Sequence, residues 1–220
     1  GVAHEEVFQD PDDGTGALLA WDPVTQKLRW KVQHPGVWNG GTMTTAGNLV
    51  FQGTAEGYLD AYDARSGKRL WRFNAGLGIV AEPISYTVAG KQYISVLVGY
   101  GGASTAYGDS HNMGWKFGVQ PRRLLTFAID GKVTLPPTAP PDKTVYAVDD
   151  PSITIDEADV QKGRQLALQC LACHGPQMRS AGAPGPDLRE SQMAISYEAL
   201  WAVLHEGSLL EKGMPRFEYF

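Results

Sequence analysis

Two cysteines and a histidine lie within five consecutive residues toward the end of the chain, at Cys170, Cys173 and His174. In this arrangement each thiol can form a thioether with one vinyl group of a porphyrin, and the adjacent imidazole can bind the porphyrin iron. These are the only two cysteines among the 220 residues, so no third thiol competes for a disulfide. The spacing predicts a covalent c-type haem, attached through Cys170 and Cys173, with His174 as an axial ligand of the iron.

Two other chemistries use a pair of cysteines at this spacing. A tetrahedral zinc site needs a second pair of cysteine or histidine ligands at similar spacing, and the sequence has none. A redox-active cysteine pair follows a strand in a βαβ pattern, which the sequence also lacks. Haem attachment is therefore favoured over a zinc half-site, a thioredoxin-like pair and a chance match.

The haem iron of an electron-transfer protein takes a second axial ligand, and a methionine thioether is a common choice. The candidates are Met178, Met193 and Met214, with His205 as the alternative for a bis-histidine site. Met178 follows His174 too closely for the chain to pass around the haem, and the helical surroundings of His205 favour a place near the surface. Met214 lies between a glycine and a proline, in an extended loop that can press one side chain inward. We therefore favour Met214.

Helical patterns surround these residues. Apolar side chains at three- and four-residue intervals form one stripe, at Val160, Gly163, Leu166, Ala167, Cys170 and Cys173. Asp156 is a suitable N-cap for that helix, and Glu157 and Asp159 complement the dipole of its first turn. A second helix is expected from Ser196 to about Glu206, ended by Gly207. Its inward residues are expected to be Leu200, Val203 and Leu204.

The first 131 residues follow a different pattern. The segment Ala20–Trp30 recurs as Ala61–Trp71, an offset of 41 residues, with matching Asp, Thr or Ser, Lys and Trp positions. Repeats of this length with short strands are typical of β-propeller blades. The Asp and Thr or Ser side chains can bond a turn, and the tryptophan can hold one blade against the next. Strands are expected at residues 16–21, 48–53, 92–99 and 124–129.

The repeat resembles the tryptophan-docking motif of quinoprotein dehydrogenases, eight-bladed propellers that bind pyrroloquinoline quinone (PQQ). The likeness extends over residues 16–131 and includes the segments 38–42, 50–57 and 98–102. Gly185-Pro186-Asp187-Leu188 resembles the loop beneath the haem of class I cytochromes c. That resemblance implies that the Pro186 carbonyl accepts a hydrogen bond from His174. The chain departs from that family at Gly163, which lies seven rather than eight residues before Cys170, and at 166–168, where an aromatic is usual.

A PQQ propeller joined to a cytochrome c is the architecture of the quinohaemoprotein alcohol dehydrogenases. The resemblance implies an all-β propeller fragment over residues 1–131, a proline-rich linker over 132–151 and an all-α class I cytochrome c domain over 152–220. The prolines of the linker are Pro136, Pro137, Pro140 and Pro141, which stiffen it. About three of the eight blades are expected, with the last cytochrome helix missing, so that the chain is truncated at both ends.

In that family a calcium ion polarises PQQ, an aspartate takes the alcohol proton, and the alcohol becomes an aldehyde or ketone. Reduced PQQ then passes single electrons to the haem, and from there to a cytochrome, copper protein or quinone. No residue of this chain can be matched to the calcium ligands or the aspartate, so no catalytic residue is assigned. The resemblance places Trp38, Asn39 and the turn Gly101, Gly102 and Ala103 near PQQ, although a purely structural role in turns remains an open alternative.

Composition agrees with a soluble globular protein, with 43% hydrophobic and 10% aromatic residues. The net charge of −5 and the absence of a basic patch argue against a nucleic-acid partner, and no apolar run is long enough to span a membrane. Covalent haem attachment indicates the periplasm. Two alternatives remain open: a non-catalytic PQQ-like propeller scaffold, and an electron-carrier cytochrome c with an accessory β domain.

Overall fold

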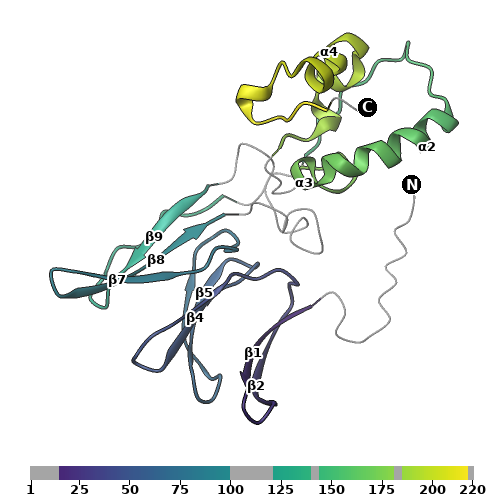
Figure 1. Ribbon diagram of the computed structural model, residues 1–220. Helices are drawn as coiled ribbons and strands as arrows, with labels where there is room; N and C mark the ends of the chain where they lie inside the picture. The colour runs from purple at the N-terminus through teal and green to yellow at the C-terminus, as the bar shows by residue number, and fades with distance from the viewer. Residues whose placement is uncertain (1–14, 100–120, 140–143, 181–184, 218–220) are drawn as a thin grey trace.

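The computed structural model describes residues 15–99, 121–139, 144–180 and 185–217. Strands occupy the first part of the chain and short helices the last part, and Figure 1 shows the two sets gathered at different ends of the molecule. A linker without regular structure in its described residues joins them. The predicted change from an all-β to a helical part is confirmed at this level.

Three antiparallel sheets lie side by side as a fan (Figure 1). The first holds β1 (Gly16–Asp22) and β2 (Lys27–His34). The second is a complete four-stranded blade of β3 (Thr42–Thr44), β4 (Leu49–Gly53), β5 (Tyr58–Asp63) and β6 (Arg69–Asn74). The third holds β7 (Ile84–Val88), β8 (Lys91–Val98) and β9 (Arg123–Phe127). The four predicted strands correspond to β1, β4, β8 and β9, each within two residues at either end.

The two repeats form the same hairpin. Ala20 pairs with Trp30 and Ala61 with Trp71, and in both hairpins the register shifts directly after the alanine. Asp22 Oδ1 accepts hydrogen bonds from the backbone of Val24 and Thr25, at 3.0 and 3.1 Å. Asp63 Oδ1 does the same for Arg65 and Ser66, at 3.1 and 2.8 Å. These bonds hold the turn that reverses the chain, which confirms the predicted role of the aspartates.

Trp30 joins the first sheet to the second. Its indole Nε1 donates a hydrogen bond to the Ala64 carbonyl at 2.9 Å, and its ring covers Gly67. A Cβ on Gly67 would lie 2.7 Å from the indole, and the φ of +70° there also favours glycine. In the second repeat Trp71 meets Phe127 of the third sheet edge to face, with ring centroids 5.5 Å apart. The predicted contact of each tryptophan with the next sheet is thus confirmed.

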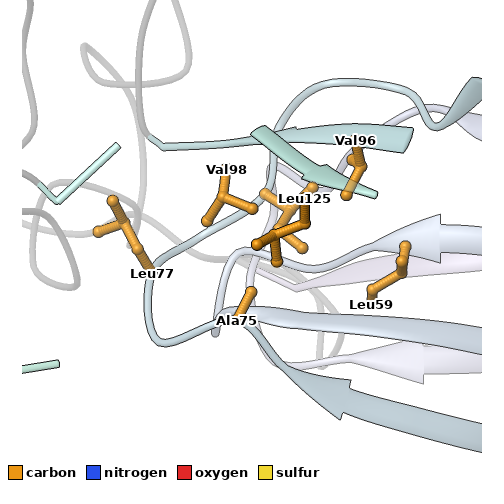
Figure 2. Close-up of a cluster of buried hydrophobic side chains, with 7 residues drawn as sticks. Leu59, Ala75, Leu77, Val96, Val98 and Leu125 are labelled. Atoms are coloured by element: carbon orange, nitrogen blue, oxygen red, sulfur yellow. The ribbon is translucent and has the colours of Figure 1, made fainter. Parts of the chain in front are cut away.

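The main apolar core lies between the second and third sheets (Figure 2). Its buried residues are Leu59, Ala75, Leu77, Ile79, Val96, Val98 and Leu125. A smaller cluster of Leu18, Val50 and Tyr62 lies between the first and second sheets, with Trp30 packed against it. Removing such side chains from water contributes about 1.5–3 kcal/mol for each large aliphatic residue. This apolar burial, together with the tryptophan contacts, fixes how the sheets lie against one another.

The linker is attached at both ends. Leu135 packs against the core between the second and third sheets, and Thr138 accepts a hydrogen bond from Arg123 Nη2 at 3.3 Å. Further along, the Val148 amide donates to the Arg189 carbonyl at 2.9 Å, and the Tyr146 amide to Glu190 Oε1 at 2.7 Å. Pro136 and Pro137 fall in the described part, whereas Pro140 and Pro141 lie outside it.

The helical part begins with α2 (Glu157–Leu166) and α3 (Leu171–His174), joined by a 3₁₀ turn at Ala167–Cys170. Asp156 caps α2 as predicted, accepting from the Ala158 and Asp159 amides at 2.7 and 3.3 Å. Further 3₁₀ turns lie at Pro176–Met178, Leu188–Glu190, Gln192–Ile195 and Leu210–Lys212. The expected second helix is α4 (Tyr197–Trp201), capped by Ser196 and continued by a π-helical turn at Ala202–Glu206. Gly207 ends it in the left-handed conformation, as predicted.

The helical part buries few of its apolar side chains, and one expectation about its packing, the inward place of Leu200, is wrong. No residue of α2 is buried, and Leu166 of the predicted apolar stripe is 49% exposed, although Val160, Ala167 and both cysteines of the stripe are half-buried. At Gly163 a Cβ would meet nothing within 4 Å. Of the three residues expected inward on the second helix, Val203 is buried and Leu204 half-buried, but Leu200 is exposed. None of the described helices is both long and apolar enough to cross a lipid bilayer.

Candidate functional site

The cysteine pair and the histidine lie where the 3₁₀ turn passes into α3. Cys170 ends that turn and Cys173 and His174 end α3, so the three side chains come from adjacent turns of one helical segment. Both thiols are free and half-buried, and His174 is buried. Burial raises the pKa of the Cys170 thiol, and the nearby Cys173 adds to the rise. Two free thiols therefore lie in the same helical segment as one buried imidazole.

The ring of His174 is held by a backbone carbonyl. Its Nδ1 lies 2.7 Å from the Pro186 oxygen, and because a carbonyl only accepts, Nδ1 carries the proton. The lone pair is then on Nε2, the nitrogen that would bind a metal. The hydrogen bond predicted between these two residues is confirmed, while its role beside a haem stays a prediction.

The loop that carries Pro186 approaches α3 closely. The Gly185 amide donates to the Cys173 carbonyl at 2.6 Å. A Cβ on Gly185 would lie 2.7 Å from that carbonyl oxygen and 3.1 Å from the His174 ring, so only glycine fits. The Ser180 hydroxyl donates to the Gly185 carbonyl at 2.5 Å. The loop and the histidine therefore form one bonded unit.

Asp187 and Arg189 complete this unit, although sequence reasoning assigned them no role. The Asp187 carboxylate is buried and accepts from Arg189 Nε and Nη2 at 2.9 and 2.7 Å. Burial by itself raises the pKa of Asp187, but the hydrogen bonds and charge of Arg189 outweigh it and hold that pKa below 3.8. An aspartate and an arginine two positions apart, directly after Pro186, were the signal in the sequence.

Met214 lies in a loop fastened to the end of the second helix. Its amide donates to the Leu209 carbonyl at 3.2 Å, and the Phe217 amide to the Leu204 carbonyl at 2.7 Å. The side chain is half-buried, as is Met178, whereas Met193 is 44% exposed. His205 is half-buried and stacks on Trp201, with ring centroids 3.8 Å apart. None of these observations tests which of them is the second axial ligand.

Asn39 and Trp38 lie in the loop before β3. Asn39 donates to the Gly36 carbonyl at 2.8 Å and accepts from the Ala55 amide at 3.1 Å. Both ends of its side chain amide are thus used to tie two turns of the strand part together, as the structural alternative proposes. Trp38 is 42% exposed. Gly101, Gly102 and Ala103 lie outside the described residues.

Comparison with known proteins also identifies a PQQ-type β-propeller in the strand part. Residues 4–94 match the PQQ family model for the β-propeller domain of glucose, ethanol and alcohol dehydrogenases. The chain is 48% identical over 207 residues to quinohemoprotein alcohol dehydrogenase ADH IIB of Pseudomonas putida. It is 42% identical over 204 residues to the quinohemoprotein alcohol dehydrogenase of Comamonas testosteroni. The chain belongs to the quinohaemoprotein alcohol dehydrogenase family. It covers 29% and 27% of the length of those two curated relatives.

Solved structures of the family resemble the chain over nearly its whole length. The quinohemoprotein alcohol dehydrogenase ADHIIG of Pseudomonas putida HK5 superposes with a TM-score of 0.69 and 35% identity, over 94% of this chain and 29% of that one. The enzyme of Comamonas testosteroni superposes with a TM-score of 0.65 and 36% identity, over 92% and 28%. A match to 93% of this chain must include residues 170–174, so the likeness extends beyond the strands into the helical part.

Proposed function

We propose that the chain is part of a PQQ-dependent quinohaemoprotein alcohol dehydrogenase, in which a haem c held by Cys170, Cys173 and His174 accepts electrons from reduced PQQ. The observation that carries the proposal is the 2.7 Å hydrogen bond from His174 Nδ1 to the Pro186 carbonyl, directly beside two free thiols. It presents Nε2 for coordination next to both groups that could attach a porphyrin.

The residues of the helical part fit a haem. Its buried side chains include a histidine, a serine and an aspartate, whereas Val203 is the single buried apolar residue among its described residues. A helical domain of this size needs more apolar burial than that to balance the entropy of ordering its chain. A porphyrin seated against α3 would supply the missing apolar surface at the place where the thiols and the imidazole meet.

In this proposal each residue has a defined task. Cys170 and Cys173 would hold the porphyrin covalently, and His174 would bind the iron through Nε2. The Pro186 carbonyl keeps the imidazole ring in one orientation and makes it a stronger donor to the metal. Met214 is the residue proposed to supply the second protein ligand to the iron. When bound, PQQ and haem supply the redox chemistry, and the protein supplies position and electrostatics.

The proposed contribution of residues 1–131 to alcohol oxidation is the scaffold of the propeller. Trp38, Gly101, Gly102 and Ala103 are proposed to lie near PQQ, together with Asn39, whose amide shapes the loop there. The calcium ligands and the catalytic aspartate of the parent enzyme are proposed to lie elsewhere in the parent protein. The relatives support an alcohol as substrate, since one of them is the 1-butanol dehydrogenase (cytochrome c) of Thauera butanivorans, 39% identical over 211 residues.

The linker, residues 132–151, is proposed to hold the cytochrome c domain, residues 152–220, over the propeller. The contacts of Leu135 and Thr138 with the strand part, and of Tyr146 and Val148 with the helical part, support a fixed arrangement. The surface proposed to receive the cytochrome c domain is the propeller turns at residues 99–109, of which only Gly99 lies among the described residues. We further propose a periplasmic enzyme that passes its electrons to a cytochrome, a copper protein or a quinone.

Covalent attachment is the direct test. The full-length parent protein, produced with a c-type cytochrome maturation system, is separated by denaturing electrophoresis and stained for haem. The wild type and the control Ser191→Ala should retain haem, whereas replacing Cys170 and Cys173 by Ala should abolish attachment. A wild-type protein that loses all haem under these conditions would refute the proposal.

A further inference from the structure

A buried carboxylate lies directly behind the hydrogen bond that holds His174. Asp187 follows Pro186 in the chain and is 7% exposed. A buried charge is costly unless it is paired and hydrogen-bonded. Arg189 meets that requirement with a two-point contact, through Nε at 2.9 Å and Nη2 at 2.7 Å. A buried ion pair therefore lies beside Pro186, and neither of its two residues has an assigned role in catalysis or haem attachment.

The carboxylate joins the two sides of the loop that carries Pro186. One oxygen receives the Arg189 backbone amide at 3.1 Å, and the other lies 3.4 Å from the Ser180 amide. Ser180 in turn bonds the Gly185 carbonyl, and Gly185 bonds the Cys173 carbonyl. The residue before Pro186 and the residue after it are therefore both fastened.

Proline cannot fasten itself in this way. Pro186 has no backbone N–H, so its carbonyl is positioned only by its neighbours and by the bond it accepts. A hydrogen bond of 2.7 Å between Nδ1 and that carbonyl weakens steeply when the two atoms move apart or out of line. Any displacement of Gly185 or Asp187 would therefore weaken the hydrogen bond between the Pro186 carbonyl and the His174 imidazole.

We infer that Asp187, paired with Arg189, is a positioning residue for the axial histidine: it holds the Pro186 carbonyl on His174 Nδ1 and thereby tunes the haem. This inference rests on the proposed haem site. A strong bond at Nδ1 gives the imidazole more anionic character, which favours the ferric over the ferrous state. The pair therefore keeps the reduction potential of the haem lower than the ligands alone would set it.

A simpler role is that Asp187 only caps the 3₁₀ turn at Leu188–Glu190. Asp156 offers a matched control, because it caps α2 through two backbone amides and its side chain bonds no residue of the 185–187 loop among the described residues. Asparagine can accept the same capping bonds as aspartate. Asp187→Asn and Asp156→Asn therefore preserve both caps, and only the first removes the charge that pairs with Arg189.

The experiment uses the full-length holoprotein and measures three quantities: haem retained after denaturation, the midpoint potential of the haem, and the exchange rate of the His174 Nδ1 proton followed by NMR. Asp187→Asn should retain its haem, raise the potential and speed the exchange. Arg189→Gln should also raise the potential and speed the exchange. The double variant should shift them little further than either single variant, because the two residues act as one unit. Asp156→Asn should match the wild type.

The outcomes separate this inference from the proposed function. A wild type without covalent haem would refute the haem site itself. Haem retained in Asp187→Asn, with potential and exchange unchanged, would overturn the inference and leave the haem site standing. If Asp187→Asn does not fold, Arg189→Gln removes the charged partner of the same carboxylate and should raise the potential and speed the exchange in its place. No shift of potential or exchange in Arg189→Gln would then overturn the inference.

Discussion

Both parts of the chain bury polar side chains, but only the strand part also buries an extended apolar core among the described residues. Every buried apolar residue except Val203 among those described belongs to the sheets and their connections, where Trp30 and the Leu59 cluster join neighbouring blades. The helical part instead buries His174, Ser180 and Asp187, which are linked through one loop. The sheets thus contain their own core, whereas the helical part is organised around a polar centre beside two thiols. The proposed haem would supply apolar surface to the part of the chain that buries the least of it.

The largest expected effect comes from replacing a leucine by alanine in each part and comparing the two losses of stability. Leu59→Ala should lower the free energy of unfolding by about 2–5 kcal/mol, because Leu59 is fully buried between two sheets. Leu166→Ala should change it by less than about 0.5 kcal/mol, since that side chain is 49% exposed and alanine favours the helix. Denaturant titration of the full-length holoprotein measures both. Equal costs at the two positions would remove the contrast.

Much of the strand part was predictable because its signals are local and repeated. The Asp22 and Asp63 turns, the tryptophan positions and the strands at residues 16–21 and 48–53 follow from period-two alternation and a 41-residue offset. The cap at Asp156 and the end at Gly207 were equally local. These predictions hold because neighbouring residues alone decide them.

The features that sequence reasoning missed depend on packing between distant residues. The exposure of Leu166 could not be read from its helical spacing, because periodicity shows which residues share a face but not what covers it. The bond from Tyr146 to Glu190 joins residues 44 positions apart. The burial of Asp187 does not follow from its place in the 185–188 loop, because an aspartate in a Pro/Gly turn is normally exposed. The contact between the linker and the residues that follow Pro186 is therefore seen only in the fold.

A second test compares the two repeats within the strand part. Trp30→Phe removes the indole bond to the Ala64 carbonyl and should cost about 1–2 kcal/mol, since that carbonyl loses its partner. Trp71→Phe keeps an aromatic ring against Phe127 and is expected to cost less. Thermal or denaturant unfolding of the two variants decides the order. If Trp71→Phe proves the more damaging, blade docking depends on ring packing more than on the hydrogen bond.

The smallest predicted effect concerns acid. Hydrogen bonds from the Ser66 side chain and backbone hold the pKa of Asp63 below its ordinary value of 3.8. Such a carboxylate stabilises the fold at pH values above 3.8, and this stabilisation is lost as the pH falls through the lowered pKa. Asp63→Asn should therefore be slightly less stable than the wild type at neutral pH, with the gap closing below pH 3.8. Asp149→Asn in the linker is the control. A gap that persists unchanged in acid would show that the Asp63 charge is irrelevant to the turn.

The central claim is that electrons leave the propeller through the haem of the helical part. It is tested by adding a primary alcohol to the oxidised full-length holoenzyme, containing PQQ and calcium, and recording the visible spectrum without a mediator. We expect the haem bands to sharpen to those of the reduced form as the alcohol is oxidised. A haem that stays oxidised while an artificial dye is reduced by the same alcohol would contradict it, because the quinone would then work without the proposed acceptor.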